Sequence, residues 1–342
     1  MLDNLLSEVD VQHLCTLLDK AHNIIVTCHV SPDGDAMGAV LAFSHFLWRK
    51  GKNAQPVVPN IFPDFLKWME RVRIYEKHEN EVAPLVAAAD LIICLDFNAP
   101  DRLQGLQKPV TDSQSPKIMI DHHLDPVDFC DWVVSRQEMS STCELLYRIL
   151  VQLEGLDPMT YEEAVCLYTG MMTDTGCFSY NSNRSDIYYI IGRLLTKGID
   201  KDKIYRNVFF NYSAERFRLM GYMLYVKLEY FPEYHASLMT LTREEQKRFS
   251  HKKGDTEGFV NIPLQIGKSR LSVFLREDTE RHNIRVSLRS VDDFPCNRMA
   301  AEFFNGGGHL NASGGELSCT MDEAVQIVRK ALKKYASLLT DR

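Results

Sequence analysis

The run Ile118-Met119-Ile120-Asp121-His122-His123 constrains the fold of this chain more than any other stretch. Three apolar residues followed by an acid and two imidazoles are typical of a buried parallel strand that carries polar groups at its C-terminal end. Ligands bind beside such strand ends in open α/β sheets. Asp-His-His alone is too short to identify a site, so its significance depends on three other stretches that also contribute acids.

Strands and helices alternate through the first part of the chain. Apolar runs predict strands over residues 24–28, 55–58, 91–96 and 118–121, with an edge strand over 132–134. Apolar residues at helical spacing predict helices over residues 5–20, 38–50, 141–153 and 161–172. This alternation predicts an α/β fold with a mostly parallel, doubly wound sheet whose two faces are covered by helices.

The pattern changes toward the C-terminus. Residues 185–231 have a helical, aromatic pattern, after which alternation predicts strands over 235–241, 270–276 and 282–290, with a turn over 277–281. Helices are expected over 298–304 and 321–339. We therefore expect a first domain over residues 1–196, a helical linker over 197–231, and a smaller α/β C-terminal domain over 232–342.

Composition excludes several classes of protein. The 342 residues carry a formal net charge of −7, and no apolar run approaches the ~18 residues that a membrane-spanning helix needs. No signal peptide is visible at the start, and the nine cysteines include no Cys-x-x-Cys pair, which disfavours a disulfide framework or a cysteine zinc site. Without a broad basic stripe, duplex DNA is an unexpected partner. These features predict a cytoplasmic protein that does not bind membranes; they allow a homodimer.

His29, Asp33 and Asp35 form the first acid-bearing stretch, on the loop between an expected strand and its helix. Buried carboxylates are costly to desolvate without cations, so this spacing favours a metal site. The alternative is that one of the acids caps the helix that begins near Ala36. Capping needs only one acid and leaves His29 unexplained.

The remaining candidate ligands follow other expected elements. Asp96 ends a strand and Asp174 follows a helix, although a turn-forming or helix-end role would suit each of them alone. The full set of candidate metal ligands is His29, Asp33, Asp35, Asp96, His122 and Asp174. Six ligands exceed what one catalytic ion takes from protein, so two divalent ions that share a bridging carboxylate fit better. This oxygen-rich set favours Mn²⁺, with Mg²⁺ or Co²⁺ as alternatives.

The motifs together resemble those of the DHH phosphoesterase family, in the same order along the chain. The four metal motifs correspond to His29–Ala36, to Asp96 with the later Asp101-Arg102, to Asp121-His122-His123, and to Thr173-Asp174-Thr175-Gly176. The glycine-rich segment Gly306-Gly307-Gly308-His309-x-x-Ala312-Ser313-Gly314 is similar to the signature of the family's associated C-terminal domain. The chain is most similar to the oligoribonuclease (nano-RNase) and pAp-phosphatase branch, which is also described as exopolyphosphatase-related.

The resemblance implies a role for each ligand. The first ion would be held by His29, Asp33 and Asp96, and the second by Asp35, Asp96, His122 and Asp174. Asp121 would orient the metal ligands without binding an ion itself, and His123 would contact the scissile phosphate. A hydroxide between the two ions would then attack phosphorus.

Substrate-binding candidates lie in the C-terminal part. Arg285, Ser287 and Arg289 share one face of an expected strand, and Arg289 matches a family arginine; Arg285 is equally compatible with a solvated surface. One glycine would suffice to end the helix before Gly306, Gly307, Gly308 and His309. Three glycines favour a close approach of backbone amides to a phosphate.

The expected activity is hydrolysis of short oligonucleotides to mononucleotides and of pAp to AMP. Pyrophosphatase is disfavoured because the chain contains no Ser-Arg-Lys tripeptide. Exopolyphosphatase and cyclic-dinucleotide phosphodiesterase remain alternatives. A nucleotide-binding module without catalysis is disfavoured because every expected metal ligand is present.

Overall fold

The computed structural model describes residues 4–69, 71–210, 212–252 and 254–340. The chain divides into two compact units, residues 1–211 and 212–342. The boundary between them falls inside the segment 197–231, which the sequence predicts to be a linker. The outer ends of the expected domains, residues 1 and 342, lie outside the described residues. None of the helices described is long and apolar enough to cross a membrane.

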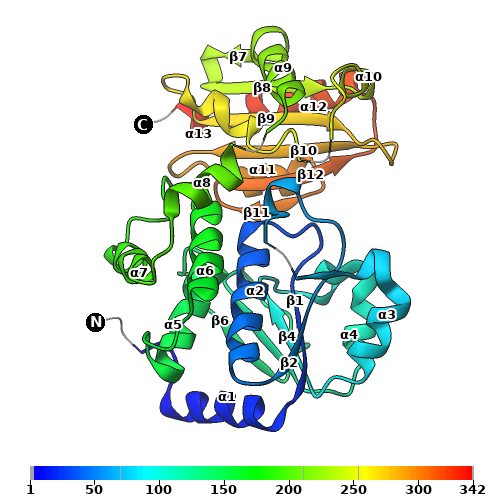
Figure 1. The fold of residues 1–342 in the computed structure, drawn as a ribbon. Helices are drawn as coiled ribbons and strands as arrows, with labels where there is room; N and C mark the ends of the chain where they lie inside the picture. The colour runs from blue at the N-terminus through cyan, green and yellow to red at the C-terminus, as the bar shows by residue number, and fades with distance from the viewer. Residues whose placement is uncertain (1–3, 70, 211, 253, 341–342) are drawn as a thin grey trace. The chain divides into compact units, whose positions relative to one another are not determined.

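The first unit is built on a six-stranded sheet in the order β3-β2-β1-β4-β5-β6, and every pairing in it is parallel. Figure 1 labels β1, β2, β4 and β6 of this sheet. The strands are β1 (Asn23–Thr27), β2 (Asn53–Val58), β3 (Arg73–Ile74), β4 (Leu91–Leu95), β5 (Lys117–Asp121) and β6 (Trp132–Ser135). All residues of β4 and β5 are buried, as their apolar sequences predict. The central strands β1, β4 and β5 therefore end side by side at one edge of the sheet.

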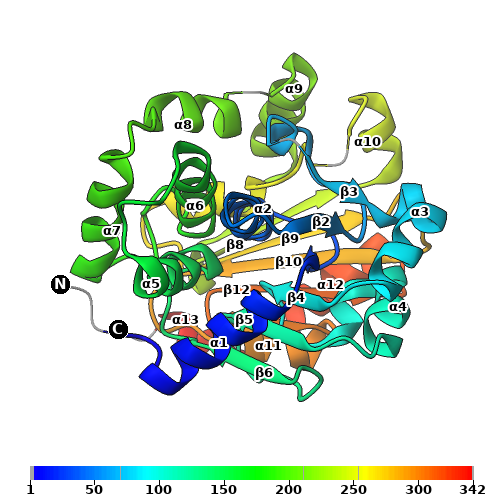
Figure 2. The ribbon, with the colours of Figure 1, turned by 60° about the horizontal axis from the view of Figure 1, so that its bottom comes forward.

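Helices cover both faces of this sheet, which confirms the doubly wound α/β fold (Figure 2). One face packs through Ile24, Val26 and Ile93 against α1 (Glu8–Lys20), α2 (Gly34–Arg49), α5 (Thr142–Glu154), α6 (Tyr161–Asp174), α7 (Ser185–Leu195) and α8 (Lys201–Phe209). The other packs through Ile25 and Ile92 against α3 (Tyr75–Ala87), α4 (Gln107–Asp112) and the 3₁₀-helix η2 (Pro100–Leu106). A further 3₁₀ turn, η1 (Asp64–Leu66), lies in the segment to which the sequence assigns no element.

The second unit has a mixed sheet in the order β11-β12-β10-β9-β8-β7, in which only β8 and β9 pair in parallel. Its strands are β7 (Glu229–Phe231), β8 (Ala236–Leu241), β9 (Leu271–Glu277), β10 (Ile284–Ser290), β11 (Gly307–His309) and β12 (Ala312–Leu317). One core contains α11 (Cys296–Phe303), α12 (Met321–Lys334) and α13 (Ala336–Thr340). Another contains α9 (Ala214–Tyr222), the π-helical turn η3 (Met223–Lys227) and η5 (Phe259–Gln265). Between these elements lie η4 (Pro232–Tyr234) and α10 (Arg243–Arg248).

Several elements differ from the sequence prediction. β7 lies inside the segment expected to be helical, because pairing with β8 outweighs its local pattern. The strands β11 and β12 lack the apolar alternation by which β9 and β10 are recognised. Gly307 and Gly308, expected to approach a phosphate or to end a helix, lie in β11. The closing helix is divided at Tyr335 into α12 and α13.

Candidate metal centre

The predicted ligands follow the central strands of the first unit. His29 follows β1, Asp96 follows β4, and His122 follows β5. Since these strands are parallel neighbours, their C-terminal ends bring the three side chains to one edge of the sheet. Asp96 has a φ of 64°, in the left-handed region that a non-glycine residue rarely adopts. The chain therefore turns sharply at this residue, directly after the fully buried β4.

Helix ends provide the other carboxylates. Asp33 and Asp35 lie at the start of α2, and Asp174 is the last residue of α6. The six predicted ligands, with His123, form three overlapping groups in which the donor atoms lie within 4.8 Å of one another. These groups are His29, Asp33 and Asp96; Asp35, His122 and Asp174; and Asp96, His122 and His123. The structure thus brings together all the residues expected to hold metal.

Asp96 faces two of these groups through different oxygen atoms. Its Oδ2 lies 3.5 Å from His29 Nε2, whereas its Oδ1 lies 3.7 Å from His122 Nε2. His122 Nε2 is also 3.6 Å from Asp174 Oδ2. A carboxylate with one oxygen directed at each group is in the position that a bridging ligand requires.

Both histidines present the same ring nitrogen to the carboxylates. His29 Nδ1 lies 2.8 Å from the Val30 carbonyl, and His122 Nδ1 lies 3.3 Å from the Met139 carbonyl. A carbonyl oxygen only accepts, so Nδ1 carries the proton in the neutral ring and Nε2 keeps its lone pair for a ligand. This is the tautomer that a metal-binding histidine needs.

Asp33 combines the two roles that the sequence offered as alternatives. Its Oδ1 accepts hydrogen bonds from the backbone amides of Asp35 and Ala36, each at 3.0 Å, and so caps α2. Its Oδ2 remains 3.8 Å from His29 Nε2. Helix capping therefore leaves one oxygen available to an ion.

The electrostatics of the cluster fit divalent cations. Burial and the charge of Asp96 raise the pKa of Asp35 to about 7, and burial and the charge of Asp35 raise that of Asp174 well above its usual range. Burial acts to lower the pKa of His29 and of His122, but neighbouring carboxylates outweigh it and raise both to about 9. Without metal the cluster retains protons to offset its concentrated negative charge, which is the charge that bound dications would neutralise.

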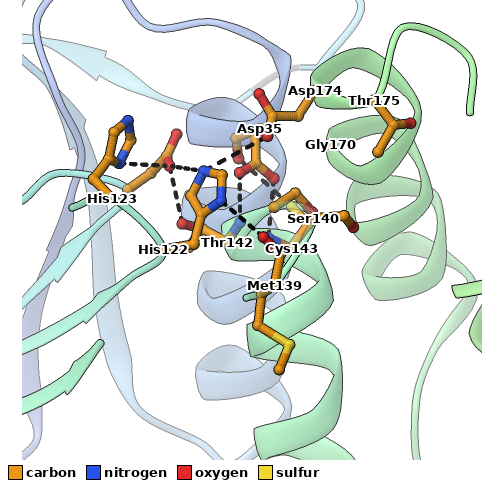
Figure 3. Close-up of polar contacts among 12 residues, drawn as sticks. Asp35, His122, His123, Met139, Ser140, Thr142, Cys143, Gly170, Asp174 and Thr175 are labelled. Carbon is orange, nitrogen blue, oxygen red and sulfur yellow. Dashed lines mark hydrogen bonds and ion pairs between the residues drawn. The ribbon is translucent and has the colours of Figure 1, made fainter. Parts of the chain in front are cut away.

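Asp121 and His123 form a separate pair beside the cluster. Asp121 is fully buried, and its Oδ1 lies 2.7 Å from His123 Nδ1. His123 Nδ1 is also 3.8 Å from Asp96 Oδ1, and Figure 3 shows the ring beside that of His122. The geometry fixes the ring of His123 but leaves two roles open, as a ligand or as a group that contacts substrate.

Sequence reasoning missed the contribution of Thr142. Its hydroxyl donates to Asp96 Oδ1 at 2.9 Å, and its backbone amide donates to Asp35 Oδ2 at 2.6 Å. The available signal was Ser141 with Glu144 three residues later, a pattern that marks a helix start. That pattern predicts where α5 begins, but not that its first turn faces two carboxylates of the candidate metal centre.

The candidate substrate residues all lie in the second unit. Arg285 and Arg289 are both on β10. They are four residues apart, and since alternate residues of a strand point to the same face, they share a face of the sheet. Arg285 Nε donates to Asp278 Oδ2 at 2.6 Å, and Arg289 Nη1 donates to the Leu288 carbonyl at 2.9 Å. The ion pair gives Arg285 a structural role, whereas Arg289 makes only a neutral contact through that nitrogen.

Two glycines of the segment Gly306–His309 lie close to the backbone of β12. A Cβ atom at Gly306 would lie 1.8 Å from the Gly314 carbonyl oxygen, and one at Gly308 would lie 2.6 Å from that of Ala312. Gly308 also has a φ of 135°. Gly307, by contrast, has open space at this position, and His309 ends the exposed strand. The pairing of β11 with β12 thus accounts for two of the three glycines.

Family models match both parts of the chain. The model of the DHH family N-terminal domain matches residues 23–171, and that of the DHHA1 domain matches residues 240–337. The first match contains all the predicted metal ligands except Asp174, and the second contains β10 and β11.

Individual proteins match over nearly the whole chain. One is an exopolyphosphatase-related protein from Bacteroides fragilis with a known crystal structure. Its sequence is 50% identical to this one, and the two structures superpose with a TM-score of 0.95 over 99% of this chain and 100% of that protein. The bifunctional oligoribonuclease and PAP phosphatase NrnA of Thermus thermophilus is 29% identical over 91% of this chain and 89% of that protein. The cyclic-di-AMP phosphodiesterase PdeA of Listeria monocytogenes is 23% identical over 95% of this chain, but over only 49% of its own length.

Proposed function

Since the chain belongs to the DHH family of phosphoesterases, we propose that it hydrolyses short oligonucleotides to mononucleotides and pAp to AMP. The observation that carries this proposal is the placement of Asp96, whose two oxygens face two separate groups of metal-binding side chains. Two adjacent cations suit an in-line displacement at phosphorus. The similarity to NrnA supports the choice of substrates.

The ligand set divides into two positions that share Asp96. One ion would be held by His29, Asp33 and Asp96. The other would be held by Asp35, Asp96, His122 and Asp174, and Mn²⁺ suits this oxygen-rich set. When bound, the two ions supply a water of lowered pKa and neutralise charge on the phosphoryl oxygens.

His123 and Asp121 complete the reaction in this proposal. The Asp121 carboxylate accepts from His123 Nδ1, which fixes the orientation of the ring. In this proposal Nε2 of the same ring contacts a phosphate oxygen of the substrate. His123 then donates a proton to the leaving oxygen, as a general acid. Asp121 is a positioning residue, since its hydrogen bond holds the orientation and tautomer of that ring.

The second unit has its own candidate substrate-binding residues. Arg289 would hold a phosphate through charge-assisted hydrogen bonds, and the segment Gly306–His309 would contact it through amides other than that of Gly306, which donates to the Ala300 carbonyl at 3.2 Å. Affinity for long single strands depends on many phosphate and stacking contacts. A chain with a net charge of −7 suits short substrates better. The proposed setting is the cytoplasm.

The test is turnover with Mn²⁺ on a panel of substrates. We expect the fastest hydrolysis on RNA of two to five nucleotides, activity on pAp, and a steep fall on longer strands. The panel includes a cyclic dinucleotide, because similarity to PdeA favours it as the second candidate, and polyphosphate. Equal rates on long and short strands would contradict the proposal, as would a clear preference for the cyclic dinucleotide or polyphosphate.

A further inference from the structure

We propose that Thr142 is a positioning residue that sets the affinity of one of the two metal positions, the one containing Asp35, His122 and Asp174. Its hydroxyl fixes the Asp96 carboxylate and its backbone amide fixes that of Asp35. This inference rests on the proposed function in that it assumes a two-metal centre. It adds a residue that is not itself a ligand.

Thr142 contacts two carboxylates that come from different elements. Asp35 lies in the first turn of α2, and Thr142 is the first residue of α5 (Figure 3). Asp96 follows β4, and Thr142 is fully buried. The amide of Cys143 adds a second hydrogen bond to Asp35, to Oδ1 at 2.9 Å. Both oxygens of Asp35 are therefore held by the first turn of one helix, whose N-terminal amides favour negative charge.

The hydroxyl selects the orientation of the Asp96 carboxylate. The terminal torsion of an aspartate side chain has a broad energy minimum, so hydrogen bonds decide where each oxygen points. Thr142 Oγ1 binds Oδ1, which is the oxygen that faces His122. Oδ2, which faces His29, has no contact with Thr142 among the described hydrogen bonds. Loss of the hydroxyl should thus affect the position containing His122 more than that containing His29.

The start of α5 is held in place without the side chain of Thr142. The Ser141 hydroxyl accepts from the Glu144 amide at 3.0 Å, and the Glu144 carboxylate accepts from the amide and hydroxyl of Ser140 at 2.8 and 2.7 Å. Arg148 Nη2 in turn donates to Glu144 at 2.8 Å. This network should keep the helix start intact in a Thr142 variant, so that the variant reports on the carboxylate alone.

Close packing of α6 limits how far Asp35 can move. A Cβ atom at Gly170 would lie 2.7 Å from Asp35 Oδ1 and 2.2 Å from Cys143 Sγ. The backbone of α6 therefore lies directly against the pair formed by Asp35 and the first turn of α5. In such a rigid setting a lost hydrogen bond is poorly compensated, because neighbouring groups cannot shift to replace it.

The experiment measures Mn²⁺ binding to the full chain by calorimetry, so it needs no substrate. Thr142→Val replaces the hydroxyl by a methyl group at nearly constant volume, and Thr142→Ser keeps the hydroxyl. We expect Thr142→Val to weaken one of two Mn²⁺ positions by about 10- to 100-fold, the usual effect of removing a group that orients a ligand. Thr142→Ser should bind both ions as the wild type does.

Thr169→Val is the matched control. Thr169 is also fully buried, but its hydroxyl donates to the Val165 carbonyl within α6, at 2.7 Å, and not to a carboxylate. This variant should leave both Mn²⁺ affinities unchanged. Thermal melting of the metal-free proteins checks folding, and Thr142→Ala replaces Thr142→Val if the valine variant does not fold.

The outcomes separate the two proposals. Wild-type affinity in Thr142→Val, equal weakening of both positions, or failure of Thr142→Ser to retain affinity would each overturn the role of Thr142. A wild-type chain that binds fewer than two Mn²⁺ ions would instead contradict the two-metal centre on which the proposed function depends.

Discussion

The two sheets of this protein present functional side chains in different ways. In the first unit the polar groups follow the ends of parallel strands, and residues from β1, β4 and β5 meet at one edge. In the second unit the candidate groups Arg285 and Arg289 lie along one strand and alternate with buried apolar residues. A parallel sheet thus gathers residues that are distant in sequence, whereas β10 displays residues that are close in sequence.

Charge and burial follow the same division. Residues 1–211 contain 19 Lys and Arg against 29 Asp and Glu, and residues 212–342 contain 20 against 17. Asp35 and Asp96 are almost completely buried, whereas the side chain of Arg285 is 51% exposed. Buried, convergent charges depend strongly on their partners, while exposed charges are screened by solvent. Substitutions in the two units should therefore differ in kind as well as in size.

The largest effect is expected from Asp96→Ala. The residue contacts both groups of ligands, so its loss should abolish measurable turnover and lower the amount of bound Mn²⁺. Turnover on dinucleotide RNA and metal content measure these effects, and circular dichroism checks the fold. A variant with a tenth of the wild-type rate would show that Asp96 is not shared by two ions.

His123→Ala separates chemistry from metal binding within the first unit. As a proton donor, His123 should contribute about 10²- to 10⁴-fold to turnover, and its variant should still bind two Mn²⁺ ions. Asp121→Asn should have a smaller effect of the same kind, because it alters only the partner of His123 Nδ1. If His123→Ala instead loses one equivalent of metal, His123 is a ligand. The group formed by Asp96, His122 and His123 would then hold one of the ions.

Arg289→Ala tests the second unit. Loss of one charge-assisted hydrogen bond to a phosphate should raise KM roughly tenfold, with metal content unchanged. Arg285→Ala is the matched comparison, since it lies on the same face but already binds Asp278. We expect the KM of that variant to change less. A larger effect at Arg285 than at Arg289 would reverse their assignment.

The last prediction concerns stability in place of turnover, and the effect should be confined to the first unit. In the metal-free protein the pKa of Asp35 is raised to about 7 and those of His29 and His122 to about 9. The folded state therefore binds more protons than the unfolded state, so the free energy of unfolding should fall as pH rises from about 4 to about 9.

Bound Mn²⁺ replaces these protons. At a concentration a hundred times its Kd, one ion should stabilise the protein by about 2.7 kcal/mol and so offset part of this loss. Hydrogen exchange of amides in β4, with those of β9 as the control, measures the effect. Equal destabilisation of both strands at pH 9 would show that the ligand cluster is not its source.

Much of the first unit could be predicted from sequence because its signals are local. Apolar runs identify β1, β4 and β5, and the residues directly after them must lie at the ends of those strands. The alternation of β9 and β10 is equally readable. The strands β11 and β12 were missed because glycine-rich segments carry no such periodicity, and β7 because a three-residue strand is defined by its partner.

The sequence by itself determined which residues are available as metal ligands, since each follows a strand or adjoins a helix end. Only the tertiary structure decided that Thr142 binds Asp35 and Asp96, which are 107 and 46 positions away. It also decided that Gly306 and Gly308 are needed for the approach of β12. The physical reason is that neither a backbone amide nor a glycine produces a periodic pattern in the sequence that would reveal its contacts. What it contacts depends on how α2, α5 and α6 pack in one unit and on how β11 pairs in the other.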